Sequence, residues 1–225
     1  MYQLIQDEAD FLVISKSANV HFHSQDGEAG VVARVELDLN IKLYPVHRLD
    51  TLTSGLIILA KSSAAAARFT ELFSTHKVQK YYLALAQGKP KKKQGWVIGD
   101  MAKSRRSQYK LLRTTANPAI TQFFSQSVAE GLRLYLLKPL SGKTHQLRVA
   151  LASLGCPILG DTLYGGEMAD RGYLHAWQLE FHYQGREYHF CADPVQGELF
   201  AAAAVQAQLA QWIAVANLPW PKSKA

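Results

Sequence analysis

The chain has 225 residues, of which 48% are hydrophobic and 19% are charged. This composition is typical of a globular protein with a large core and excludes a disordered, collagenous or coiled-coil chain. Lys and Arg number 25 against 18 Asp and Glu, a formal net charge of +7. Such an excess indicates an anionic partner, most simply nucleic acid.

Signals for export or membrane insertion are not found in the sequence. The longest uninterrupted apolar run is 199–205, whereas a membrane span needs about 20 residues. The first ten residues carry three acidic and no basic side chains, the reverse of a signal peptide. Cys156 and Cys191 are the only cysteines and form no CxxC pair, which fits two free thiols in a reducing compartment. We therefore expect a cytoplasmic protein without membrane contact.

The predicted elements are many short strands and few helices. Strands are predicted at 11–15, 55–61, 80–86, 108–113, 119–126 and 132–137, with a hairpin around Gln184-Gly185 near the end. Helices are predicted after an N-cap at Ser62 or Ser63, from near Thr144 to Gly155, and over about 198–217. This irregular mixture predicts an α+β fold with a largely antiparallel mixed sheet. We expect a single domain over 1–225 with its core at about 10–195.

The segment 89–93 (KPKKK) is the only low-complexity stretch. Strand patterning resumes within ten residues, so the segment is interpreted as an exposed loop rather than a linker between domains. Its lysines form either a solvated charge cluster or a loop that contacts phosphates.

A polar cluster precedes the apolar strand at 55–61. It contains Arg48, Asp50, Thr53 and Ser54. Burial at the edge of a sheet would raise the pKa of the Asp50 carboxyl, so an ionised Asp50 needs a cationic partner. The alternative is that Asp50 is a turn or capping residue that satisfies backbone groups.

The triplet 142–144 (GKT) is similar to the end of a phosphate-binding P-loop. The first glycine of GxxxxGK[ST] would fall at Leu137, so the backbone cradle cannot form and an ATP site is not expected. Arg148 instead lies in the first turns of the helix near 144. Leu147 and Leu151 turn inward beside it, so we expect a charged partner for Arg148 near the core.

Histidine is frequent, but its spacing does not favour a metal site. His21 and His23, two apart on a predicted strand, would share one face like metal ligands. No second pair stands at zinc spacing, so we expect no metal. No GxSxG elbow is present, which argues against a serine hydrolase of that class.

Several motifs, taken together, resemble the RNA pseudouridine synthases of the RluA type. HRLDxxTSGL matches completely at 47–56, and KxYxA ahead of a glycine matches at 80–88. PxTGRTHQIRVH corresponds to 139–150, with departures at Ser141, Lys143, Leu147 and Ala150. PILGDxxYG matches at 157–165 and LHA at 174–176, so the resemblance covers nearly all of 11–194. It implies the pseudouridine-synthase fold, with an active-site cleft across the sheet.

Two departures from the family pattern concern the N-terminal side. The family's KPxGxxVH is 16–21 (KSANVH) here, without the proline and the glycine. We expect this change to alter a loop at the RNA side and to leave the chemistry intact. The small RNA-binding domain that precedes the catalytic domain in many relatives has no counterpart here, so we expect the catalytic domain itself to hold the RNA.

The resemblance implies an isomerase that converts uridine to pseudouridine without cofactor or metal. Asp50 matches the catalytic aspartate, which acts as nucleophile or as base at the sugar. Tyr82 matches the tyrosine that would stack on the base and take part in proton transfer. Arg148 matches the arginine that would pair with the aspartate and keep it charged.

The resemblance also implies contacts with RNA, ribosomal or transfer, by a monomer. Arg48 would fill the space that a flipped uridine leaves. Further substrate contacts are expected at the motif positions His47, Thr53, Lys80 and Leu147. Candidates for phosphate contacts are Lys103, Arg105, Arg106 and Lys110, each of which has a solvated loop as its alternative reading.

Two other functions would use parts of the same sequence. A catalytically silent RNA-binding module or RNA chaperone with the same fold would not need a carboxylate facing an anionic ligand, so the intact Asp50, Tyr82 and Arg148 argue against it. An unrelated nucleotide enzyme that uses 141–144 (SGKT) fails on the missing glycine.

Overall fold

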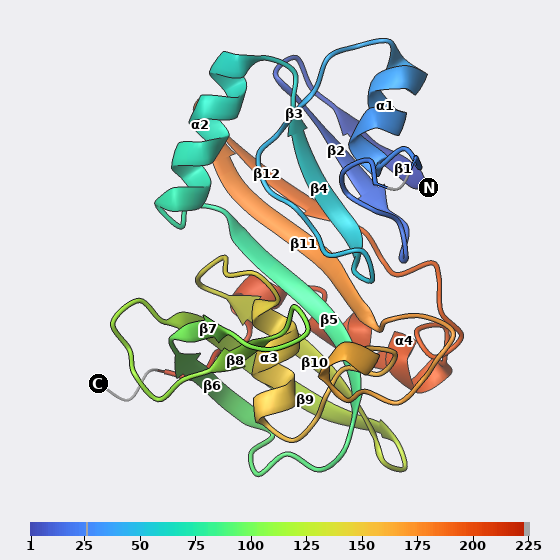
Figure 1. Ribbon diagram of the computed structural model, residues 1–225, viewed down its shortest axis with the longest axis vertical. Coiled ribbons are helices and arrows are strands. Elements are labelled where there is room, and N and C mark those ends of the chain that lie inside the picture. The colour runs from blue at the N-terminus through green and yellow to red at the C-terminus, as the bar shows by residue number, and fades with distance from the viewer. Residues whose placement is uncertain (26, 223–225) are drawn as a thin grey trace. The chain divides into compact units, whose positions relative to one another are not determined.

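A computed structural model describes residues 1–25 and 27–222, which form two compact units (Figure 1). Unit 1 comprises Met1–Lys80 and His175–Pro194, and unit 2 comprises Tyr81–Leu174 and the chain from Val195 onward. The chain passes between the units at 80–81 within β5, at 174–175 at the start of β11, and at 194–195 after β12. That the two units together form a single domain stays a prediction.

Unit 1 is a mixed sheet with two helices. Its elements are β1 (Tyr2–Asp7), β2 (Phe11–Lys16), α1 (Val31–Leu39), β3 (Tyr44–Pro45), β4 (Ser54–Ala60), α2 (Ser63–Ser74), most of β11 (Leu174–Tyr183) and β12 (Arg186–Cys191). The strand order is β1-β2-β4-β11-β12, and β3 also pairs with β4. All of these pairs are antiparallel except β4 with β11, which run parallel.

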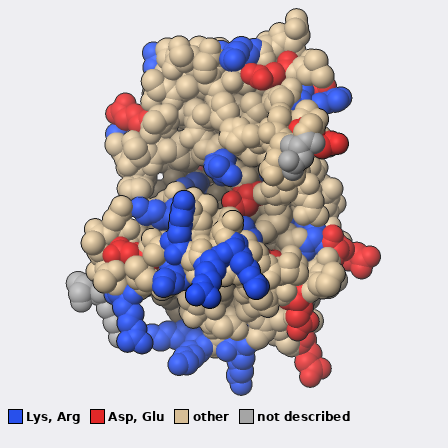
Figure 2. All heavy atoms as spheres, viewed as in Figure 1, with Lys and Arg blue, Asp and Glu red and all other residues tan. Residues whose placement is uncertain are grey.

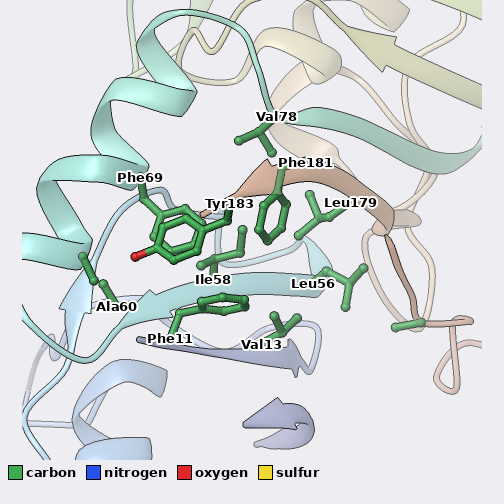
Figure 3. Close-up of a cluster of buried hydrophobic side chains, with 12 residues drawn as sticks. Phe11, Val13, Leu56, Ile58, Ala60, Phe69, Val78, Leu179, Phe181 and Tyr183 are labelled. Atoms are coloured by element: carbon green, nitrogen blue, oxygen red, sulfur yellow. The ribbon is translucent and has the colours of Figure 1, made fainter. Parts of the chain in front are cut away.

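The core of unit 1 is built on β4, whose seven residues are all buried. Figure 3 shows its side chains meeting aromatic rings from β2, β11 and α2. The Phe69 ring stacks on Tyr183 with centroids 4.7 Å apart, and Phe11 meets Phe69 edge to face at 5.2 Å. Helix α2 begins at the predicted cap, because Ser62 Oγ accepts the Ala65 N–H at 3.1 Å. This packing fixes the strand that follows the Asp50 cluster.

Unit 2 is an antiparallel sheet with a small separate hairpin. Its elements are most of β5 (Gln79–Gln87), β6 (Gln94–Gly99), β7 (Met101–Lys103), β8 (Tyr109–Leu111), β9 (Ala119–Ala129), β10 (Leu132–Pro139), α3 (Gln146–Ser153), η1 (Thr162–Tyr164), α4 (Ala203–Trp212) and η2 (Val215–Asn217). The strand order is β5-β10-β9-β6. Among the described residues, strands β7 and β8 pair only with each other, and we call 101–111 the β7–β8 hairpin.

The predicted α+β class, with largely antiparallel strands, is confirmed. The turn between β11 and β12 is also confirmed at Gln184 and Gly185, which take the positive φ values of 49° and 78° that such tight hairpins require. The strand predicted at 108–113 is shorter, since only Tyr109–Leu111 pairs. Five elements were not predicted from the sequence: α1, β1, β3, β6 and β7.

Two predictions about local structure were wrong. His21 and His23 lie in an irregular segment and not on a strand; the His21 carbonyl instead accepts the N–H of Val31 at the start of α1. The last helix begins at Ala203 rather than near 198, because the preceding residues form turns on Gly197, whose carbonyl accepts the Phe200 N–H. A gap at 213–214 then separates α4 from η2.

Candidate active site

Asp50 lies in a turn that leads directly into β4. The Thr53 N–H donates to the Asp50 carbonyl at 3.0 Å, closing the turn. Leu49 and Thr53 are buried at 4% and 2% exposure, whereas Asp50 is half-buried. The main chain at Asp50 therefore forms a turn, which places the carboxylate just before a fully buried strand. That the Asp50 side chain itself caps backbone groups, the alternative reading of the sequence, stays a prediction.

The ammonium group of Lys16, at the end of β2, holds this turn. Its Nζ donates to the carbonyls of Thr51 at 3.1 Å, Val20 at 2.8 Å and Ser17 at 2.9 Å. Lys16 is 1% exposed, and a buried cation requires such acceptors. Lys16 lies in a family motif, but no role for it was predicted from the sequence.

The segment 16–21 contacts the Asp50 turn a second time. His21 Nδ1 lies 3.2 Å from the Thr51 hydroxyl. Asn19 stands where the family pattern has glycine and adopts a φ of 59°, a left-handed conformation that asparagine tolerates better than most residues. The turn therefore forms without the glycine.

His47 joins the same loop to β4 as a neutral ring. Its Nε2 accepts the Ile58 N–H at 2.8 Å, and its ring lies 4.7 Å from that of Phe73. Removal from water, together with the nearby Lys80 ammonium, lowers the pKa of His47 to about 3. Burial also lowers the pKa of Lys80, whose Nζ lies 5.8 Å from the Phe73 ring centre. That His47 and Lys80 contact the substrate stays a prediction.

The first residues of β4 are fixed by the LHA motif. The Ser54 hydroxyl lies 2.7 Å from His175 Nδ1, and His175 Nε2 lies 2.6 Å from the Ala192 carbonyl, so Nε2 is the protonated nitrogen. Gly55 has a φ of 105°, and a Cβ there would lie 2.2 Å from the Ala176 carbonyl oxygen. The close pairing of β4 with β11 therefore requires glycine at this position.

Tyr82 lies on β5 in unit 2. It pairs with Leu137 of β10, is half-buried, and stands between the buried Tyr81 and Leu83. A paired strand fixes the backbone position of Tyr82, which suits a residue expected to stack on a base.

Arg148, on α3, forms a buried ion pair within unit 2. Its Nε and Nη2 donate to the two carboxylate oxygens of Asp161 at 2.7 and 2.8 Å, and the two side chains are 6% and 1% exposed. Tyr164 covers the guanidinium, with Cζ 4.9 Å from the ring centre. The sequence predicted a charged partner for Arg148 but not Asp161. Its pairing with Asp50, which belongs to unit 1, stays a prediction.

Positive charge is divided unequally between the two units. Unit 2 has 16 Lys and Arg against six Asp and Glu, a formal +10, whereas unit 1 has nine against 12, a formal −3. Figure 2 shows Lys and Arg side chains gathered over the region where Figure 1 draws β7 and β8. The exposed basic residues of this hairpin are Lys103, Arg105, Arg106 and Lys110.

The remaining predicted contact residues differ in exposure. Arg48 is exposed, as a residue that enters RNA must be. Thr53 and Leu147 are buried at 2% and 8% exposure. The lysines of 89–93 are exposed in the loop between β5 and β6.

Metal-binding clusters and membrane-spanning helices are both absent from the part of the chain that the structure describes. Within 1–25 and 27–222, no group of three or more His, Cys, Asp or Glu is arranged to hold a metal ion. No helix in the same part of the chain is long and apolar enough to cross a membrane. Cys156 is buried and Cys191 exposed, and neither forms a disulfide.

Comparisons with known proteins identify the class to which this fold and these motifs belong. Residues 10–153 match the RNA pseudouridylate synthase family, so the chain belongs to the RNA pseudouridine synthases, which are isomerases acting on RNA. An RNA pseudouridine synthase of Haemophilus influenzae is 50% identical over 210 residues, which cover 92% of this chain and 94% of the relative. The dual-specificity enzyme RluA of Escherichia coli K12 is 33% identical over 192 residues, covering 78% and 84%. The chain is therefore of the RluA type.

Solved structures support the same fold. Human RNA pseudouridylate synthase domain containing 1 aligns with a TM-score of 0.77 at 24% identity, covering 99% of this chain and 97% of its own. Human RNA pseudouridylate synthase domain containing 4 aligns with a TM-score of 0.73 at 23% identity. The predicted pseudouridine-synthase fold is confirmed.

Proposed function

We propose that this enzyme isomerises specific uridines in structured ribosomal or transfer RNA, with Asp50 as the catalytic group. The reaction breaks the bond from the sugar C1′ to N1 of uracil, turns the base, and joins C1′ to C5. The proton on C5 leaves and N1 gains one, so no atom is added and no electron is exchanged. Neither a cofactor nor a metal is required by this balance.

The observation that carries the proposal is the turn at Asp50, which hydrogen bonds hold in place from two sides. A carboxylate that attacks C1′ or removes a proton from the sugar must be held in place, because small misplacements cost much of the rate. The bonds from Lys16 and His21 to Thr51, and from Thr53 to Asp50, supply that rigidity. Whether Asp50 acts first as nucleophile or as base stays open.

Tyr82 and Arg148 are proposed to act on the same uridine as Asp50. The Tyr82 ring would stack on uracil while the base is detached, and its hydroxyl would take part in proton transfer at C5. Arg148 would favour the ionised form of the Asp50 carboxyl. The support for these roles is the family motif at 80–88 and at 139–150, together with the paired strand that carries Tyr82 and the ion pair that holds Arg148.

RNA is proposed to lie mainly against unit 2. Its +10 charge would neutralise phosphates, and the exposed β7–β8 hairpin would contribute Lys103, Arg105, Arg106 and Lys110. Arg48 would occupy the space that the flipped uridine leaves, since flipping costs a few kcal/mol of stacking. We further propose that the enzyme is a cytoplasmic monomer.

A catalytically silent RNA-binding module is the alternative. Pseudouridine mapping in cellular ribosomal and transfer RNA, with and without this protein, separates the two. We expect one or a few positions to lose pseudouridine when the protein is absent and to regain it when the protein is restored. Identical maps, with RNA binding intact, would favour the silent module.

A further inference from the structure

The β7–β8 hairpin is too small to hold its own shape. Its strands have three residues each, and an isolated two-stranded hairpin is marginally stable in water. It also carries four exposed cations within 103–110, which repel one another. Contacts with the rest of unit 2 must therefore order it.

Tyr164, at the end of η1, supplies such a contact through its hydroxyl. The oxygen accepts the Tyr109 N–H of β8 at 2.9 Å and lies 2.8 Å from His145 Nδ1, at the start of α3. The His145 ring meets both tyrosine rings edge to face, with centroids 5.5 Å from Tyr109 and 5.6 Å from Tyr164. One residue earlier on each side, the Gln108 side chain of the hairpin donates to the Leu163 carbonyl of η1.

The ring of the same tyrosine covers the catalytic-site candidate Arg148. The guanidinium Cζ lies 4.9 Å from the Tyr164 ring centre, while Asp161, three residues earlier, pairs with the guanidinium nitrogens. The hydroxyl and the ring of Tyr164 thus contact different partners: the hydroxyl contacts the hairpin and the ring contacts Arg148.

We propose that Tyr164 is a positioning residue that docks the β7–β8 hairpin on α3 and thereby presents its cations to RNA phosphates. The inference rests on the proposed function. A flexible hairpin would lose conformational entropy when RNA binds and orders it. A hairpin that is already docked avoids this loss, so docking should strengthen RNA binding. The hydroxyl then governs RNA affinity, and the ring governs the orientation of Arg148 during the reaction.

Two substitutions separate these roles. Tyr164→Phe removes the hydroxyl and keeps the ring, whereas Tyr164→Leu removes both. Tyr173→Phe is the matched control, because the Tyr173 hydroxyl also accepts a distant backbone N–H, from Leu199 at 3.2 Å, and bonds a side chain, Asp170, at 2.5 Å.

The first measurement is hydrogen–deuterium exchange and tryptic cleavage of the free protein. Tyr164→Phe should speed exchange over 104–110 and cleavage after Arg105 and Arg106, while Tyr173→Phe leaves both as in the wild type. Unchanged exchange in Tyr164→Phe would overturn the proposal, whatever the enzyme does to RNA.

The second measurement is the affinity for a bulk transfer RNA mixture, with kinetics on an RNA that is modified. In Tyr164→Phe the Kd should rise roughly three- to tenfold, the range expected for one lost hydrogen bond, and KM should rise more than kcat falls. In Tyr164→Leu kcat should fall further. A loosened hairpin with unchanged Kd would overturn the link to RNA. A wild-type protein that binds RNA but forms no pseudouridine would refute the proposed function alone, because exchange and Kd still test the role of Tyr164.

Discussion

The Arg148 guanidinium and the Asp161 carboxylate meet in two charged hydrogen bonds of 2.7 and 2.8 Å, away from solvent. Such a fork-to-fork pair fixes both charge and orientation. Because Arg148 is also the residue expected to support Asp50, its stability role and its catalytic role have to be measured separately.

Replacing Arg148 with methionine should leave the Asp161 charge buried and should lower the free energy of unfolding by roughly 3 to 5 kcal/mol. Asp161→Asn should also destabilise, because it leaves the Arg148 charge buried. The double variant Arg148→Met, Asp161→Asn should lose less than the sum of the two singles. Denaturant unfolding of the four proteins measures this difference, and strictly additive losses would contradict an energetic coupling.

Asp161 also illustrates what the sequence can and cannot predict. The position of Leu147 and Leu151 on one helical stripe was enough to place Arg148 at the core boundary and to predict a charged partner. The identity of that partner depends on the path of the loop that brings 157–165 back to α3, and no local periodicity encodes that path. In the sequence, Asp161 appears only as the aspartate of the motif at 157–165, with no partner predicted for it.

The same limit applies to the elements that were missed. The buried run of β4 and the capped start of α2 were predicted because apolar residues and Ser62 give strong local signals. Helix α1 begins at Val31, and its N-cap residue Gly30 has no side chain to cap it, so its start carries no such signal. The role of Lys16 was missed because it depends on three carbonyls from two loops, of which Thr51 lies 35 residues away.

The folded protein should lose stability between about pH 6.5 and pH 3 because of His47. Its pKa is lowered to about 3 in the folded state, so across this window the unfolded chain binds the proton and the folded protein does not. Unfolding free energy should therefore fall as pH falls, by at most about 1.4 kcal/mol per pH unit from this group.

His47→Gln tests this origin, because an amide oxygen can accept the Ile58 N–H without titrating. The variant should show a flatter pH dependence of unfolding than the wild type below pH 6.5. His182→Gln, at an exposed histidine, is the control and should keep the wild-type slope. Equal slopes in all three proteins would assign the pH dependence to other groups.

RNA affinity should fall steeply with salt, since a +10 unit binds phosphates by releasing counterions. Neutralising Lys103, Arg105 and Arg106 together should reduce the slope of log Kd against log salt by about 2 to 3 if all three contact phosphates. Neutralising the exposed Arg34, Lys42 and Lys77 of unit 1 should leave the slope unchanged. If both triple variants keep the wild-type slope, the hairpin cations are merely solvated.

Tyr82→Phe should keep base stacking and lose proton transfer. We expect kcat to fall roughly 100-fold, the lower end of general acid–base contributions, while RNA affinity changes little. Tyr81→Phe, at the buried neighbour on β5, is the control and should turn over normally. If Tyr82→Phe turns over at the wild-type rate, the Tyr82 hydroxyl is not essential for the proton transfer.

The most direct test of the catalytic role of Asp50 is the rate at which Asp50→Asn releases tritium from C5-tritiated uridine in a modified RNA. The amide keeps the shape of the side chain but is neither nucleophile nor base, so we expect less than about a hundredth of the wild-type rate. RNA affinity and unfolding should stay near wild type, and mass spectrometry should show that the amide has not reverted to aspartate. Tritium release at or above that hundredth, from intact Asp50→Asn protein, would show that the chemistry lies on another residue.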